Sequence, residues 1–170
     1  MALVPNQVNN FKVYVQGQGY LGFSDFTVPP IINQTDELRG SGFAGPILVP
    51  VIGHVEDLTM SMSIFALYPG AQKFLYQQSL NMQMNGVVQY MDNTTGAFSK
   101  APWNFLFTSY PKEFNIGRFQ QGAKPDMTHS RVVTAMQIIY NGTRIVYIDK
   151  GNLVFEVDGT DYLSQDRTWL

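Results

Sequence analysis

Hydrophobic and polar residues alternate along most of this chain with the period of two that is typical of β-strands. The cleanest alternation covers residues 58–64, where Leu, Met, Met and Ile alternate with Thr, Ser and Ser. Similar patterns predict strands at 11–16, 20–28, 86–91, 98–110 and 153–157. Only residues 69–82 place apolar side chains at helical spacing without any β-branched residue, and we expect one helix there.

The strongest local signal is a predicted hairpin of residues 131–140 and 143–149, joined by Asn141 and Gly142. Asn-Gly between two β-branched runs is typical of a type I′ turn, because both central residues of that turn need a positive φ. A two-residue loop then predicts three cross-strand pairs: Tyr140 with Thr143, Ile138 with Ile145, and Met136 with Tyr147.

Both faces of this hairpin carry apolar side chains that need to be buried against other residues. The face that carries Ile138, Ile145, Met136 and Tyr147 is apolar, and we expect it to pack into the core of the subunit. The opposite face is also too apolar to be fully solvated, so a neighbouring copy of the chain is expected to supply part of its cover. The candidate residues of this face and its turn are Gln137, Ile139, Asn141, Gly142, Arg144 and Val146.

Two long segments, 29–54 and 115–128, show no clear periodicity and are expected to be loops. Long loops are uncommon in compact domains and usually have a function. The first contains Pro, Gly and apolar residues, which favour a segment that docks against something over a disordered linker. No shift of composition divides the 170 residues, so we expect a single domain over 1–170.

The composition points to assembly. Charged residues make up only 14% of the chain and aromatic residues another 14%, which leaves few groups to solvate a monomer's surface. Burial of part of that surface in an assembly explains the composition, although ordinary variation also does. The net charge is −2 and no basic cluster occurs, which argues against tight binding of nucleic acid. No apolar run is long enough to span a membrane and no secretory leader is apparent, so we expect a soluble protein without membrane insertion.

The sequence offers no assembled catalytic site. It has no cysteine and two histidines, His54 and His129, neither of which has metal-ligand spacing around it. Asp158 and Asp161 flank a glycine in a pattern that is typical of a capped turn. The G-x-G-x-x-G sequence at 17–22 is followed by β-prone residues and prolines, so a turn between antiparallel strands is expected instead of a dinucleotide site. We therefore predict no catalytic, metal or cofactor-binding residues and no cofactor.

Several turns and strand ends, in the same order along the chain, carry a family resemblance. They include the opening strand 10–17, Glu37-Leu-Arg-Gly-Ser-Gly-Phe43, Lys112-Glu113, the Asn-Gly hairpin, and Val157-Asp-Gly-Thr-Asp161. In this order they resemble the major tail tube proteins of contractile-tailed phages, a family that includes the tubes of R-type pyocins. Leu38 stands where the family usually has an aromatic residue, Phe43 where it has methionine, and the chain ends in Arg-Thr-Trp-Leu instead of Gly-Leu.

The resemblance implies a mainly β fold: a β-sandwich or partial barrel with one flanking α-helix and long loops, which completes a closed β-barrel tube on oligomerisation. It also implies a non-enzymatic subunit of stacked hexameric rings that form the conduit for genome delivery. The implied partners are other copies of the chain and the sheath, tape-measure, baseplate and tail-terminator proteins, with DNA passing through without tight binding. The implied location is the virion tail, after assembly in the cytoplasm of the bacterial host.

Three segments are the expected assembly elements: an N-terminal arm at 1–9, an interaction loop at 31–53 and a C-terminal tail at 163–170. The arm and the tail are expected to become ordered only on assembly. The candidate inter-subunit or inter-ring contacts within them are Leu38, Arg39, Gly40, Phe43, Arg167, Trp169 and Leu170. The resemblance also implies that the Asn-Gly hairpin is a candidate tube-wall hairpin, with Gln137, Ile139, Asn141, Gly142, Arg144 and Val146 as its candidate wall residues.

Other functions remain open at this point. A bacteriocin or secretion-type contractile system uses a related tube. A monomeric ligand-binding β-barrel would keep an apolar cavity, and an enzyme on the same scaffold would need converging groups such as His129 and Asp126.

Overall fold

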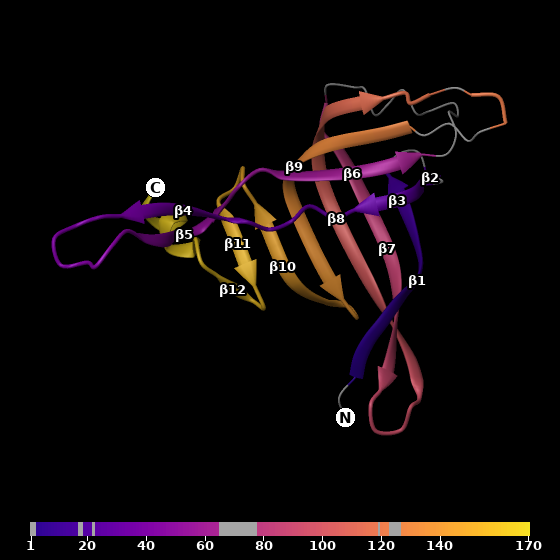
Figure 1. Cartoon of the computed structure of the whole chain (residues 1–170), viewed down its shortest axis with the longest axis horizontal. Coiled ribbons are helices and arrows are strands. Elements are labelled where there is room, and N and C mark those ends of the chain that lie inside the picture. Colours follow the sequence, from indigo (N-terminus) through magenta and orange to yellow (C-terminus); the bar gives the residue numbers. More distant parts are fainter. Residues whose placement is uncertain (1–2, 17–18, 22, 65–77, 119, 123–126) are drawn as a thin grey trace.

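A computed structural model describes residues 3–16, 19–21, 23–64, 78–118, 120–122 and 127–170. This part of the chain contains twelve strands and one short helix (Figure 1). The strands are β1 Leu3–Val15, β2 Gly19–Leu21, β3 Phe23–Thr27, β4 Asn33–Leu38, β5 Ile47–Val55, β6 Leu58–Ile64, β7 Leu80–Asp92, β8 Phe98–Asn115, β9 Met127–Tyr140, β10 Thr143–Asp149, β11 Val154–Val157 and β12 Thr160–Asp161; the helix is α1 Ser164–Trp169. Within the described residues, no helix is long and apolar enough to cross a membrane.

Ten strands form one antiparallel sheet, and β4 and β5 form a separate hairpin. The main path of the large sheet runs β12-β11-β10-β9-β8-β7-β1-β2. Strand β9 changes partner along its length: residues 127–133 pair with β6, whereas residues 135–140 pair with β10. This change folds the sheet over itself, so that β6 and β3 lie across the larger layer (Figure 1). The result is the predicted β-sandwich, and it is not closed into a barrel.

The core lies between these two layers. The alternation at 58–64 is confirmed: β6 buries Leu58, Met60, Met62 and Ile64, while the residues between them turn away. Side chains from alternate positions of the larger layer's strands pack against β6. These buried residues are Val13, Val15, Met82, Met84, Phe107, Met127, Val133, Met136 and Ile148. Packing of these two alternating faces is what holds the layers together.

The Asn-Gly hairpin forms as predicted, but its register is different. Asn141 and Gly142 have φ of 47° and 84°, and Tyr140 pairs with Thr143. A bulge at Ile145 then shifts the register, so that Ile138 pairs with Val146 and Met136 with Ile148. The extra residue reverses the direction of every later side chain on β10. The predicted pairs with Ile145 and Tyr147 are therefore wrong, and Val146 packs against the core instead of lying on the wall face with Arg144.

The N-terminal segment is not a separate arm in this structure. Strand β1 begins at Leu3 and pairs with β7 over its whole length, with interruptions at residues 6 and 9. The first half of β1 and the β7–β8 hairpin extend together beyond the sandwich (Figure 1). The segment 19–27 also differs slightly from expectation, since it forms the two strands β2 and β3. The turn between antiparallel strands expected after residue 16 is confirmed by the pairing of Val15 with Gly19.

The helix expected at 69–82 lies mostly outside the described residues. Its last part is wrong, because Leu80, Asn81 and Met82 belong to β7. The helix that the structure does describe is α1, within the segment 163–170 that was expected to be a tail.

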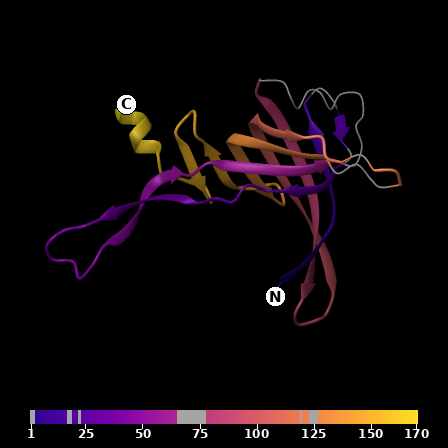
Figure 2. The same cartoon turned by 45° about the horizontal axis from the view of Figure 1, so that its top comes forward.

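The segment 31–53 is also not a loop. Residues 33–38 and 47–55 pair as β4 and β5, with Leu38 opposite Ile47 and Asp36 opposite Val49. This hairpin projects from the sandwich, with α1 beside its base (Figure 2). The contact at the base is made by Leu163, whose side chain packs against Gly53, where φ is 72°.

Candidate functional site: surfaces for assembly

The β4–β5 hairpin carries the largest set of exposed apolar side chains among the described residues. Leu48 and Ile52 are 70% and 69% exposed. Both side chains belong to β5. We call the exposed apolar residues of this hairpin the hairpin surface: Leu38, Phe43, Ile47, Leu48, Val49, Val51 and Ile52.

Four of the predicted contact residues meet at or near the tip of the hairpin. Leu38 and Phe43 are half-exposed, and the Phe43 amide donates a hydrogen bond of 3.3 Å to the carbonyl of Gly40. Arg39 forms an ion pair of 2.7 Å with Glu37 inside the same hairpin, yet its side chain remains largely in solvent. The tip thus presents a half-exposed aromatic ring and an accessible guanidinium.

The C-terminal residues divide into an anchor and an exposed end. Arg167 binds the carboxylate of Asp161 and the carbonyl of Leu153, so it fastens α1 to its own subunit. Its hydrogen bond holds the pKa of Asp161 below its ordinary value. Trp169 and Leu170, in contrast, are 77% and 94% exposed. Of the three candidate contacts in this segment, only these two are largely available to a neighbour.

The β9–β10 hairpin presents Gln137, Ile139 and Arg144 on the face opposite the core. Arg144 lies opposite Ile139, forms an ion pair of 2.8 Å with Glu156 on β11, and stands 5.0 Å from the centre of the Tyr147 ring. Asn141 and Gly142 form the exposed turn. Of the candidate wall residues, Gln137, Ile139 and Arg144 therefore lie together on one side of the sheet.

His129 is a buried structural residue and is not exposed for catalysis. It is 1% exposed, and its Nδ1 lies 2.8 Å from the carbonyl oxygen of Glu113. Burial lowers the pKa of His129 to about 4, and the nearby Arg131 acts in the same direction. Arg131 itself is fully buried and donates hydrogen bonds of 2.9 Å to the hydroxyl and the carbonyl of Ser109. Asp126, the example of a converging partner in the enzyme alternative, lies outside the described residues.

The large sheet has open edges. Strand β2 covers β1 only at residues 13–15, so within the described residues the edge of β1 from Leu3 to Lys12 has no strand beside it. At the other end of the sheet, the two-residue strand β12 covers only Glu156 and Val157 of β11. Long uncovered edges offer unpaired backbone groups to another chain.

Two assembly features were not singled out from the sequence. One is β5, whose apolar side chains point to both faces and therefore give no period of two; the uninterrupted apolar run 47–52 with Pro50 was the available signal. The other is the row of amide side chains on β7 and β8, Asn81, Gln83, Asn85 and Asn104, which alternate with core residues along these strands. The alternation of amide and apolar residues along each strand was the signal that could have identified this row.

An open β-sandwich with uncovered sheet edges and a projecting apolar hairpin defines a class of protein: a structural subunit that is completed by its neighbours. Comparisons with known proteins agree. The family model of the phage tail tube protein FII matches residues 5–170. The tail tube protein of Escherichia phage P2 is 24% identical over 169 residues, which span 96% of each chain.

Solved structures share the fold. A chain in the cryo-EM structure of the sheath/tube terminator of PVC, an extracellular contractile injection system, superposes with a TM-score of 0.54 and 15% identity over 81% of this chain and 96% of that one. A chain in the tube-terminating cap of the anti-feeding prophage gives 0.54 and 13% over 82% and 93%. The chain belongs to the phage tail tube protein FII family, and it is a subunit of the inner tube of a contractile tail.

Proposed function

We propose that this protein forms hexameric rings that stack into a hollow tube, and that the tube is a passive conduit for genome delivery without bond chemistry. The single observation that carries this proposal is the pair of uncovered edges on one continuous sheet. Joining the β1 edge of one copy to the β11 end of the next extends the sheet around a ring. Closure of that ring removes every long edge at once.

The β4–β5 hairpin is proposed to bind a neighbouring subunit, in the same ring or in the next. Its exposed apolar side chains have little to contact within their own subunit, and burial against another copy stabilises the assembly. Phe43 would be the apolar anchor at the tip and Arg39 an ion-pair partner. A contact between unlike surfaces of stacked rings repeats without closing, and such a contact builds a filament.

The remaining candidates have narrower proposed roles. Trp169 and Leu170 extend the apolar contacts at the end of α1, while Arg167 keeps α1 in position. Gln137, Ile139, Arg144 and the Asn141–Gly142 turn are proposed to belong to the tube wall. The sheath is the proposed partner outside the tube, the tape-measure protein inside it, and the baseplate and terminator at its ends, with assembly in the host cytoplasm.

The tube of a phage-derived bacteriocin or secretion-type contractile system is the second candidate, because a chain of an extracellular contractile injection system shares the fold. The two candidates differ in what the lumen contains and not in how the subunits assemble.

Electron microscopy of the purified protein tests the central proposal. Hollow tubes or rings with sixfold symmetry are expected at high protein concentration or on added baseplate. A protein that stays monomeric under both conditions would refute it. Nucleic acid within intact particles from the source would distinguish the two candidates.

A further inference from the structure

The β4–β5 hairpin continues the second layer of the sandwich. Strand β3 pairs with β6 and β4 pairs with β5, while the chain runs from β3 into β4 and from β5 into β6. Between the two pairs, the Glu56 amide donates a hydrogen bond of 2.8 Å to the carbonyl of Ile32, which keeps the two segments together. The four strands therefore form one long ribbon. Its first half lies over its own sheet, and its second half, the hairpin, projects past β11 and β12 (Figure 1).

The core face of the large sheet continues beyond the part that this ribbon covers. The cover extends to Phe107, whose ring centre lies 5.5 Å from that of Phe26 on β3. Residues directly opposite each other on antiparallel strands share a face, so the register continues the core face into the extension of β1, β7 and β8. Within the described residues, no strand of the second layer lies over this extension (Figure 1). We call its apolar side chains the open face: Leu3, Val8, Phe11, Val88, Trp103 and Tyr140.

The open face suits an apolar partner. Leu3 and Val8 are more than half exposed. The register places one charged residue on this face, Asp92 at its far end, and its carboxylate is buried and accepts a hydrogen bond of 2.8 Å from the Thr94 amide. The indole of Trp103 donates its hydrogen bond, 2.9 Å long, to the Tyr90 hydroxyl within the same cluster. Covering this indole would therefore leave no buried donor unsatisfied.

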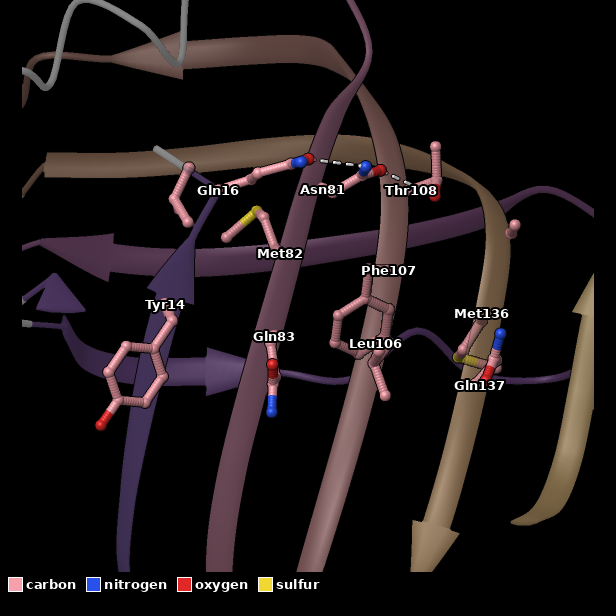
Figure 3. A pocket seen from close by; sticks show the side chains of 12 residues that line it. Tyr14, Gln16, Asn81, Met82, Gln83, Leu106, Phe107, Thr108, Met136 and Gln137 are labelled. Carbon is pink, nitrogen blue, oxygen red and sulfur yellow. Dashed lines mark hydrogen bonds between the residues drawn. The ribbon is translucent and has the colours of Figure 1, made fainter. Parts of the chain in front are cut away.

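The opposite face of the same sheet does not suit an apolar hairpin. Its side chains include Gln16, Asn81 and Thr108, which are linked across β1, β7 and β8 by hydrogen bonds of 2.8 and 3.0 Å (Figure 3). Lys12 on β1 and Lys100 on β8 add exposed charges. Apolar side chains placed there would remove water from polar groups without replacing its hydrogen bonds. Of the two faces, only the core side gains from contact with the hairpin.

The free edges of the sheet bring a neighbour's open face to the hairpin. Strand β2 covers β1 at residues 13–15, so the part of β1 left for β11 of another copy is Leu3 to Lys12. This part is also the edge of the open face. A hairpin that projects past β11 then lies over β1, β7 and β8 of that copy. Strands rise about 3.3 Å per residue and lie about 4.8 Å apart in a sheet, so the nine residues of β5 are long enough to cross about six strands.

We propose that the β4–β5 hairpin of each copy lies on the open face of the next copy in the same ring, where it supplies the part of the second layer that this copy lacks. The inference rests on the proposed tube and assigns the partner of the hairpin as a second copy of the chain. Apolar side chains of the hairpin surface pack against apolar side chains of the open face, as between the two layers of a sandwich. Because every copy carries both surfaces, the contact repeats around the ring and closes with it.

Cross-linking in assembled tubes tests this assignment, because the chain has no cysteine of its own. One thiol is placed on the open face with Val8→Cys. The second is placed on the hairpin with Leu48→Cys or, in a separate variant, with Val49→Cys, since these adjacent side chains point to opposite sides of β5. A short bismaleimide should join neighbouring copies in at least one of the two double variants. Denaturing gels should then show a ladder that ends at the hexamer.

Gln7→Cys replaces Val8→Cys in the matched control. Gln7 is adjacent on β1 but pairs with Gln89, on the opposite face of the sheet, and should give no ladder with either hairpin thiol. Val88→Cys, directly opposite Val8, is the second position on the open face if Val8→Cys does not assemble. Linkage through Gln7→Cys alone, or no linkage from the open face, would overturn the proposal. A ladder that continues beyond the hexamer would also overturn it, because the hairpin would then join stacked rings. If the unmodified protein makes no tubes, the proposed function fails first, so the two failures are distinct.

Discussion

Removal of the two most exposed apolar side chains of the hairpin surface should block assembly without unfolding the subunit. The change is the double variant Leu48→Gln/Ile52→Gln. Full burial of a Leu or Ile side chain is worth about 1.5–3 kcal/mol. Since these side chains are 70% and 69% exposed in the subunit, most of that gain is available only from a neighbour. The double variant should therefore lose about 2–4 kcal/mol per contact.

Such a loss is large on the scale of assembly. At 1.4 kcal/mol for each tenfold change, the critical concentration for tube formation should rise about 30-fold or more. The measurement is the concentration of unpolymerised protein left after sedimentation of tubes. The urea midpoint of the subunit should hardly change, because exposed substitutions usually alter stability by less than about 0.5 kcal/mol.

Ile116→Gln is the matched control for this experiment. Ile116 follows β8 and is also exposed, but it lies outside the hairpin surface. It should polymerise at the normal concentration. If the double variant also does so, the hairpin makes no contact in the tube and this reasoning is wrong.

Three further predictions concern the subunit. The pKa of His129 falls from 6.5 to about 4 on folding, mainly because the side chain is buried. Between pH 6.5 and about 4 the unfolded chain therefore binds a proton that the folded chain does not. The free energy of unfolding should fall by about 3 kcal/mol as the pH drops from 7 to 4. His129→Gln should flatten that part of the urea-midpoint profile; an unchanged slope would contradict a buried neutral imidazole. Gly53→Ala should destabilise by about 1–3 kcal/mol, because its φ is positive and the new Cβ would lie 2.5 Å from Leu163; protease should then release α1. Arg144→Met should lower the free energy of unfolding by less than about 1 kcal/mol, because the ion pair of Arg144 with Glu156 is partly solvated. A larger loss, measured by thermal unfolding, would contradict this weak contribution.

Arg39 offers a test of the proposed ion pair across the subunit boundary. Arg39→Glu should impair tube formation while the monomer stays folded, because it reverses a largely exposed charge beside Glu37. Circular dichroism would report the fold and electron microscopy the tubes. Normal tubes from this variant would remove Arg39 from the interface, and Arg39→Lys serves as the control that keeps the charge.

The sequence by itself determined those elements whose signals are local. The alternation at 58–64 specified β6 and its buried face, because a period of two directly separates core from solvent positions. The Asn141–Gly142 turn specified a hairpin, since few other dipeptides accept two positive φ values. Ordered agreement of turns along the chain was enough to indicate the tail tube family.

Only the tertiary structure decided how distant strands meet. The bulge at Ile145 reversed the faces of β10 and moved Val146 into the core, and no local pattern marks where a bulge occurs. Strand β9 passes between β6 and β8 and buries Arg131 against Ser109, although no local pattern in its strand indicates a buried charge. The hairpin β4–β5 escaped prediction for the opposite reason. Its strands have no core to face within the subunit, so both sides of β5 are apolar and the alternation that reveals a half-buried strand is missing.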